Sequence, residues 1–254
     1  MRFGVHLGLL MVYSQSFMKL NGLNALVTGG SQGLGKTIAE HYLREGANVV
    51  LCARGERELN ATRDELAAKF ATRKVLATAC DVSNETQVND LVVCALRELG
   101  SLDILVLNAG VYGPMGPTES VDLNEWRRAI DINLFGVLLP CRAVIPHFKR
   151  AGRGKIVVLS GGGATNPRPN ISSYAASKAA VVRLMETLAL ELKDFQVDVN
   201  AIAPGALATR LVDEVLAAGP EKVGAIFYEQ NKQWKEKGAT SLDLGAGLDR
   251  KSVV

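Results

Sequence analysis

The chain has 254 residues, of which 48% are hydrophobic and 22% are charged, and its formal net charge is +3. These proportions are ordinary for one globular domain with a full core. The small net charge, with no long basic run and no patch of interleaved aromatic and basic residues, argues against a nucleic-acid surface and against a basic face for membranes.

The N-terminal segment loosely resembles a short signal sequence, because Arg2 precedes the apolar stretch Val5–Tyr13. His6 and Gly8 interrupt that stretch, and no small-residue cleavage site follows it. We therefore expect residues 1–17 to be an extension outside the core and residues 18–254 to form a single domain. No stretch reaches the roughly 18 apolar residues that a membrane span needs, so we expect no membrane partner.

The cysteines form no CxxC pair, and no histidine lies at ligand spacing from them. This pattern predicts reduced, buried thiols in a cytoplasmic protein and no metal site. The four residues are Cys52, Cys80, Cys94 and Cys141.

Strand and helix patterns then alternate along the chain. Six strands are predicted, several of them from short apolar runs: Asn24–Thr28, Ala47–Ala53, Lys74–Cys80, Leu102–Leu107, Ile156–Leu159 and Val197–Ile202. Apolar stripes at helical spacing start at Leu34, at Leu59 and after Ser83, which we expect to be an N-cap. Two longer helices are predicted over Leu123–Lys149, bent or shortened by Pro140 and Pro146, and over Ser172–Leu192.

This alternation predicts an α/β fold with a doubly wound, mostly parallel sheet. Several of the strands are nearly continuous apolar runs, as expected when helices cover both faces. Residues 207–237 follow the last clear strand and are helical in character, so we expect a flap over the site. Gly238–Val254 contains no apolar run long enough for a further strand.

A glycine-rich segment, Thr28–Gly35, lies directly between the first strand and the first helix. Glycines there permit a tight turn and a close approach of a pyrophosphate, and the helix N-terminus offers free N–H groups and a positive dipole end. A flexible turn is the alternative, but the position after the first strand favours nucleotide binding. The candidate phosphate-contacting residues are Gly29, Ser31, Gln32, Gly33, Leu34 and Gly35.

The end of the second strand indicates the type of dinucleotide. NAD-preferring enzymes usually carry an acid there for the ribose 2′-hydroxyl, whereas this chain has Ala53 and then Arg54. A cation at this point can pair with a 2′-phosphate, so NADP is favoured over NAD. The alternative is an exposed arginine without a ligand, and Gln32 adds no second charge.

Two further strand ends carry candidate cofactor contacts. Asp81 and Val82 follow the third strand, and Asn108, Ala109 and Gly110 follow the fourth. We expect Asp81 to accept a hydrogen bond from the adenine and the backbone of 108–110 to pack on the ribose. Each segment is alternatively a simple turn.

Tyr174 and Lys178 are four residues apart on a predicted helix, so the phenol and the ammonium can face one site. A free phenol has a pKa near 10, which corresponds to about 4 kcal/mol above neutrality. A positive charge about 4 Å away contributes about 4 kcal/mol at an effective dielectric near 20. Lys178 is therefore expected to make Tyr174 a usable acid and base. A solvated helix face is the alternative.

With these motifs together, the chain from about Lys19 to about Trp234 resembles the short-chain dehydrogenase/reductase family, in its compact single-domain branch with a Rossmann-like fold. TGxxxGxG at Thr28–Gly35, NAG at Asn108–Gly110, YxxxK at Tyr174–Lys178 and the pair Pro204–Gly205 occur in the family's order. The resemblance implies hydride transfer between NADP(H) and a small carbonyl or alcohol substrate.

The resemblance also implies roles for single residues. Tyr174 is the proton donor, and Lys178 also bonds the nicotinamide ribose. Asn133 resembles the asparagine that supports a proton-relay water. Thr209, after Pro204–Gly205, resembles the residue that holds the carboxamide of the cofactor.

Two departures from the family pattern stand out. The family usually has a catalytic serine 13 residues before the tyrosine, where this chain has Gly161, so Ser160 is expected to supply the hydroxyl through a shifted loop. Ser172 and Ser173 are weaker candidates. The family's last strand has no counterpart in Gly238–Val254. A homo-oligomer is still implied, as a dimer through the long helices rather than a tetramer.

Two other functions stay open. One alternative is an NADP-binding sensor or assembly partner with little catalysis, which Gly161 favours. The other is an isomerase or dehydratase on the same scaffold, although such relatives tend to be longer. The expected substrate walls are Val111–Glu119, Gly162–Ile171 and Leu207–Trp234, with Phe227, Tyr228 and Trp234 available to pack on a ligand.

Overall fold

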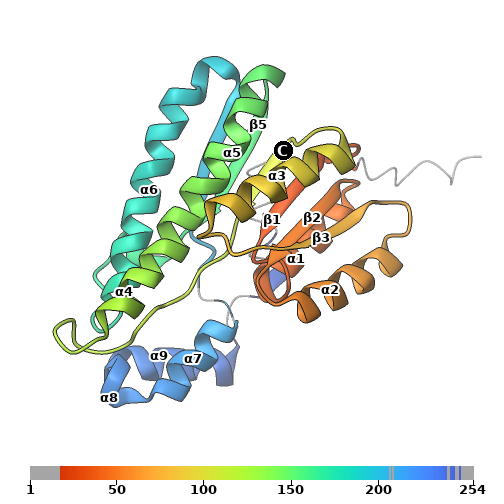
Figure 1. Cartoon of the computed structure of the whole chain (residues 1–254). Coiled ribbons are helices and arrows are strands. Elements are labelled where there is room, and N and C mark those ends of the chain that lie inside the picture. Colours follow the sequence, from red (N-terminus) through yellow and green to blue (C-terminus); the bar gives the residue numbers. More distant parts are fainter. Residues whose placement is uncertain (1–17, 206, 208, 239–240, 244–245, 247–254) are drawn as a thin grey trace, which may run out of the picture.

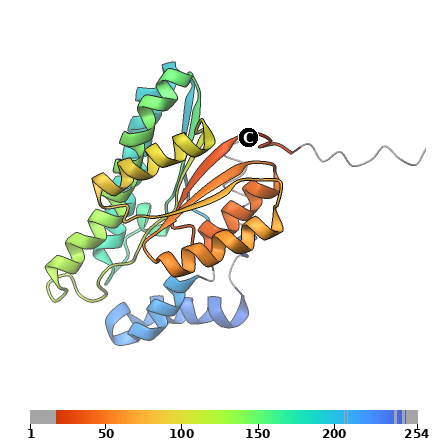
Figure 2. The same cartoon turned by 45° about the vertical axis from the view of Figure 1, so that its right-hand side comes forward.

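The computed structural model describes residues 18–205, 207, 209–238, 241–243 and 246. The expected N-terminal extension, residues 1–17, lies outside the described residues. Six parallel strands form one sheet in the order β3-β2-β1-β4-β5-β6 (Figures 1 and 2). Their bounds are β1 Asn24–Thr28, β2 Asn48–Ala53, β3 Val75–Ala79, β4 Ile104–Leu107, β5 Gly154–Leu159 and β6 Val197–Ile202.

Helices cover both faces of the sheet, which confirms the doubly wound α/β fold. Alternate side chains of each strand enter opposite cores: Val27 packs with helices α1 and α2, whereas Leu26 packs with α3, α5 and α6. The bounds are α1 Gly33–Arg44, α2 Glu56–Lys69, α3 Glu85–Leu99, α5 Gly136–Ala151 and α6 Ser172–Leu192. The strand order reverses between β1 and β4, where ligands bind such sheets.

The cap of α3 differs from the prediction. Asn84, not Ser83, is the N-cap, and its side chain accepts a hydrogen bond from the Gln87 N–H at 3.0 Å. The Ser83 hydroxyl instead donates to Asp81 at 2.6 Å. Both residue types favour this position, so the sequence alone did not distinguish them.

The predicted long helix is present, but it is interrupted at another place. It consists of α4 Leu123–Ile130, a π-helical turn at Asp131–Phe135 and α5, which continues to Ala151 with both Pro140 and Pro146 inside it. The combined segment is long and apolar enough to cross a membrane by length and composition. Its inner face, with Val144 and Phe148 fully buried, instead packs in the core beside the sheet.

The C-terminal part forms a helical lobe and then returns to the sheet. Helices α7 Arg210–Ala218, α8 Pro220–Val223 and α9 Ala225–Lys237 lie together below the sheet in Figure 1. Leu242, Asp243 and Ala246 are helical, with Ala246 buried in the core on the α1 side. No described residue of Gly238–Val254 is in a strand, and β6 pairs with β5 alone among the described strands.

Candidate active site

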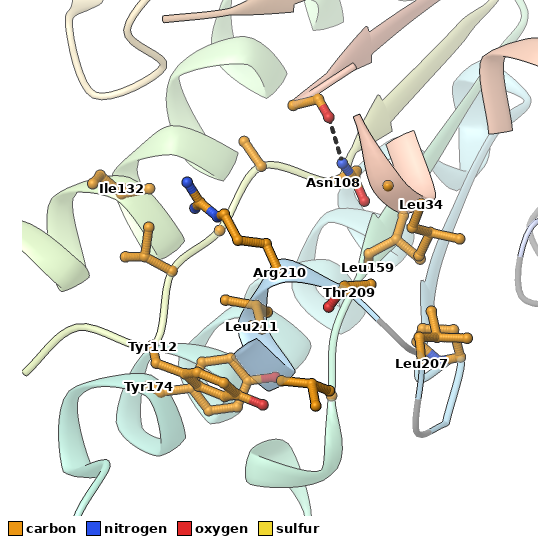
Figure 3. A pocket seen from close by; sticks show the side chains of 18 of the residues that line it. Leu34, Asn108, Tyr112, Ile132, Leu159, Tyr174, Leu207, Thr209, Arg210 and Leu211 are labelled. Atoms are coloured by element: carbon orange, nitrogen blue, oxygen red, sulfur yellow. Dashed lines mark hydrogen bonds between the residues drawn. The ribbon is translucent and has the colours of Figure 1, made fainter. Parts of the chain in front are cut away.

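A cleft of about 1360 Å³ lies at the carboxyl ends of the strands, between the sheet and the lobe α7–α9 (Figure 3). All the predicted site residues line it except Gly35 and Asn133, which lie behind its wall. Those that line it are Gly29, Ser31, Gln32, Gly33, Leu34, Arg54, Asp81, Val82, Asn108, Ala109, Gly110, Ser160, Tyr174, Lys178, Pro204, Gly205 and Thr209.

The glycine-rich loop has the backbone that its sequence predicts. Gly29 and Gly33 have φ of +65° and +55°, in the left-handed region that favours glycine. A Cβ on Gly35 would collide with the Gly29 carbonyl oxygen and with Asn108 Nδ2, so the helix can approach the loop only with glycine there. No side chain caps the N-terminus of α1, which leaves its first N–H groups facing the cleft. The loop therefore fits a pyrophosphate.

Asn108 holds this loop to the end of β4. Its side chain donates to the carbonyl oxygens of Thr28 and Gly29 at 3.0 and 3.1 Å, and the Thr28 hydroxyl accepts the N–H groups of Asn108 and Ala109. Figure 3 shows Asn108 beside Leu34, on the opposite wall from the tyrosines. The side chain thus supports the loop, and the backbone of 108–110 lines the cleft.

Arg54 and Asp81 lie at the end of the cleft formed by β2 and β3. Arg54 is exposed and makes no hydrogen bond or ion pair with the described residues. Partial burial would raise the pKa of Asp81, but hydrogen bonds from Ser83 and the charges of Arg128 and Arg54 hold that pKa below its ordinary value. A free cation and an ionised carboxylate therefore share this end.

Tyr174 and Lys178 lie one turn apart on α6, and both line the cleft, as predicted. Lys178 Nζ is 5.8 Å from the centroid of the Tyr174 ring and donates to the Leu159 carbonyl oxygen at 2.7 Å. Burial lowers the pKa of Lys178 to about 8. Burial raises the pKa of Tyr174, and the charge of Arg168 opposes this rise. The expected lowering of the Tyr174 pKa is therefore absent here, because burial dominates.

Asn133 joins three parts of the site from within the π-helical turn. Its Oδ1 accepts the Val111 N–H at 2.9 Å, while Nδ2 donates to the Val111 carbonyl at 2.8 Å and to the Ser177 hydroxyl at 3.0 Å. A Cβ on Gly110 would meet both Asn133 Oδ1 and Lys178 Nζ, so these two groups flank Gly110. The amide fixes the segment after β4 against α6.

Ser160, expected to supply the hydroxyl near Tyr174, makes no direct hydrogen bond to Tyr174. Ser160 Oγ is buried and has no hydrogen-bond partner among the described residues. A Cβ on Gly161 would collide with the Tyr174 hydroxyl, so the phenol occupies the space of the absent side chain. Ser172 and Ser173 do not line the cleft. The Ser172 hydroxyl accepts a hydrogen bond from the Trp126 indole N–H, and the Ser173 hydroxyl donates to the Tyr112 carbonyl.

Tyr112 and Arg168 lie within the predicted walls but were not singled out as neighbours of Tyr174. The Tyr112 ring is 4.8 Å from that of Tyr174 and 6.1 Å from that of Phe227, and Figure 3 shows the two tyrosines side by side. Arg168 lies in the same wall. Phe227 and Trp234 line the cleft as expected, whereas Tyr228 does not. Only the folded path of the loops brings these side chains together.

Acidic, histidine and cysteine side chains do not gather for a metal within the described residues. Cys52, Cys80 and Cys141 are buried free thiols, and Cys94 is half-buried.

The chain matches the sequence profile of the short chain dehydrogenase family over residues 23–219. It is 40% identical to glucose 1-dehydrogenase of Gluconobacter oxydans over 189 residues, which cover 74% of this chain and 70% of that one. It is 41% identical to 3beta-hydroxysteroid dehydrogenase 1 of Eggerthella lenta over 199 residues, or 78% of this chain and 76% of that one.

Solved structures agree with the sequence comparisons. Levodione reductase superposes with a TM-score of 0.84 at 30% identity and covers 92% of this chain and 91% of its own. NAD⁺-bound xylitol dehydrogenase superposes with a TM-score of 0.85 at 25% identity, covering 93% and 94%.

Proposed function

Because this chain belongs to the short-chain dehydrogenase family, we propose that it interconverts a carbonyl compound and an alcohol with NADP(H), using Tyr174 as the acid and base. The observation that carries the proposal is one cleft lined by the glycine-rich loop, Tyr174 and Lys178. That arrangement brings a pyrophosphate site and an acid–base group to the same carboxyl edge of the sheet.

Each residue has a defined part in this proposal. A bound nicotinamide supplies or accepts the hydride. The Tyr174 hydroxyl gives its proton to the carbonyl oxygen in reduction and takes it back in oxidation. The Lys178 ammonium, oriented by the Leu159 carbonyl, stabilises the phenolate that remains. Asn133 positions the segment that carries Gly110 and Val111, which is a supporting role.

The choice of NADP is a separate proposal that depends on Arg54. This guanidinium has no partner among the described residues and lies at the cleft end next to β3, where a 2′-phosphate can pair with it. One structural relative is an NAD⁺-bound enzyme, so family membership alone does not select the cofactor. In addition, we propose that the lobe α7–α9 acts as the substrate flap, with Pro204, Gly205 and Thr209 holding the carboxamide end.

The test compares the unmodified chain with Tyr174→Phe. We expect the unmodified chain to oxidise NADPH with at least one member of a broad carbonyl panel. We expect Tyr174→Phe to lower kcat by a factor of about 10² to 10⁴, because the proton donor is lost. NADPH affinity should stay within about twofold, since the phenyl ring keeps the packing. Tyr228→Phe, which lies outside the cleft, is the matched control and should change neither quantity.

A second candidate function is cofactor binding with little catalysis. Gly161 at the usual serine position and the unpaired, buried Ser160 hydroxyl favour it, since no hydroxyl from these residues bonds Tyr174. Micromolar binding of NADPH with no turnover across the panel would select this candidate. Turnover that depends on Tyr174 would exclude it.

A further inference from the structure

Arg168 lies in the wall of the cleft, on the segment between β5 and α6, and is half-buried. Its guanidinium makes no hydrogen bond and no ion pair with any described residue. A partly buried cation that has no hydrogen-bonded or anionic partner loses hydration that such a partner would replace. The position therefore suits an anion that arrives with a ligand.

The guanidinium lies next to the group proposed to carry out the chemistry. A Cβ on Gly162 would collide with Arg168 Nη2, and a Cβ on Gly161 would collide with the Tyr174 hydroxyl. The cation and the phenol thus lie against consecutive glycines of one loop. The charge of Arg168 also acts on the Tyr174 pKa, which supports their proximity.

The other cations on the lobe side of the cleft have acidic partners. Arg210 pairs with Glu214 at 3.1 Å, and Lys235 pairs with Asp213 at 2.6 Å. Arg168 instead faces an aromatic ring, with Cζ 6.0 Å from the centroid of Phe227. A stacked guanidinium keeps its planar fork of N–H donors available for a carboxylate.

We propose that the substrate of this cleft carries a carboxylate, which Arg168 binds while the carbonyl lies at Tyr174. The aromatic pair Tyr112 and Phe227 forms the apolar wall between these points, so the substrate is a keto acid or hydroxy acid with an apolar body. This inference rests on the proposed function and narrows its substrate class.

The first test uses a graded series of aromatic keto acids, in which the carboxylate lies progressively farther from the ketone, each paired with its methyl ester. We expect at least one acid to be reduced with a kcat/KM about tenfold or more above that of its ester. The reason is that a charge-assisted, bidentate contact between the carboxylate and Arg168 is lost in the ester. Arg168→Met should remove this preference and leave the ester within about twofold. Arg168→Lys should retain part of it.

The control is Arg210→Met, a second cleft arginine whose charge is already paired, and it should keep the acid preference. A loss in Arg168→Met that is equal for acids and esters would overturn the inference, since Arg168 would then act on the carbonyl or on the fold. Reduction of esters with no preference for any acid would also overturn it, while leaving the proposed function intact.

A binding measurement keeps the two proposals distinguishable. Calorimetric titration of the NADPH-loaded protein with benzoate should give binding that benzamide does not reproduce and that Arg168→Met weakens by about tenfold or more. If no carbonyl compound is reduced, the proposed function fails, and this titration still decides whether Arg168 is an anion site. Equal weak binding of benzoate and benzamide would overturn the inference.

Discussion

Lys178 carries a buried ammonium that donates to the Leu159 carbonyl, and burial lowers its pKa to about 8. Its pKa in the unfolded chain is near 10.4. Between these two values the unfolded state binds more protons than the folded state, so the free energy of unfolding rises with pH. Below about pH 8 both states are charged, and the burial cost is fully present.

We predict the pH dependence of stability from this shift. From pH 8 to pH 10 the unmodified chain should gain about 2 kcal/mol relative to Lys178→Met, which lacks the titrating group. Urea unfolding at several pH values measures this difference. Lys232→Met, which removes an exposed lysine of α9, is the matched surface control. A flat difference for Lys178→Met would contradict the prediction.

The second prediction at the residue scale concerns Arg54 and the choice of cofactor. Arg54→Asp should weaken NADPH binding by about tenfold or more and improve NADH binding, because a charge-assisted contact to phosphate contributes about 1.5–3 kcal/mol. Fluorescence titration with both cofactors measures this. Arg57→Asp changes an exposed arginine outside the cleft and should leave both affinities nearly unchanged. Equal affinities of the unmodified chain for NADPH and NADH would reject the role of Arg54.

The residues that the sequence located best are those at strand ends. The glycine loop, Asp81 and Asn108 each follow a strand, and the carboxyl ends of parallel strands meet at one edge of the sheet. Arg168 could not be located in this way, because its distance from Tyr174 depends on the path of the segment between β5 and α6. The path of the same segment also decides where the Ser160 hydroxyl lies. That hydroxyl is buried and has no hydrogen-bond partner among the described residues.

At the scale of elements, the π-helical turn Asp131–Phe135 is the joint between α4, α5 and the active-site helix α6. Apolar spacing over five residues does not separate a π turn from an α turn, so the sequence predicted a helix there but not its geometry. Helix α5 is not shortened at Pro140 or Pro146, because a helix packed in the core can lose single backbone hydrogen bonds and continue.

We predict that Asn133→Leu lowers the free energy of unfolding by at least about 2 kcal/mol. The change leaves the N–H and carbonyl of Val111 and the hydroxyl of Ser177 without their partner, and each unsatisfied group costs about 1–3 kcal/mol. Urea unfolding measures the loss. Asn124→Leu alters an exposed position on α4 and should stay within about 0.5 kcal/mol. Similar stabilities of the two variants would contradict the role of this joint.

At the scale of the whole molecule, alternating patterns were sufficient for the sheet and its two helical layers. The bounds of β1 and β6 were predicted to the residue, although β1 is fully buried and β6 alternates apolar with polar residues. The segment after α9 shows the limit of this approach. The sequence predicted that this segment lacks a strand. It did not predict that the helical residue Ala246 is buried in the core on the α1 side, because that burial depends on tertiary packing and not on a local pattern.

We predict that two copies of the chain associate through the long helices α5 and α6. Leu190 is 79% exposed on α6, one of the long helices through which the dimer is proposed to form. We predict a dimer in sedimentation experiments, shifted toward monomer by Leu190→Glu. Val93→Glu places the same charge at a 63% exposed apolar position on α3 and should leave the dimer intact. A monomer for the unmodified chain, or equal effects of both variants, would contradict association through α5 and α6.

Transfer of deuterium to a ketone substrate from NADPH that carries deuterium at both C4 positions tests the proposed reaction most directly. We predict that the unmodified chain yields an alcohol with one deuterium on the former carbonyl carbon, detected by mass spectrometry. Tyr174→Phe should give no labelled alcohol above background in the same time. Tight NADPH binding with unlabelled or absent product from the unmodified chain, or full labelling by Tyr174→Phe, would contradict hydride transfer assisted by Tyr174.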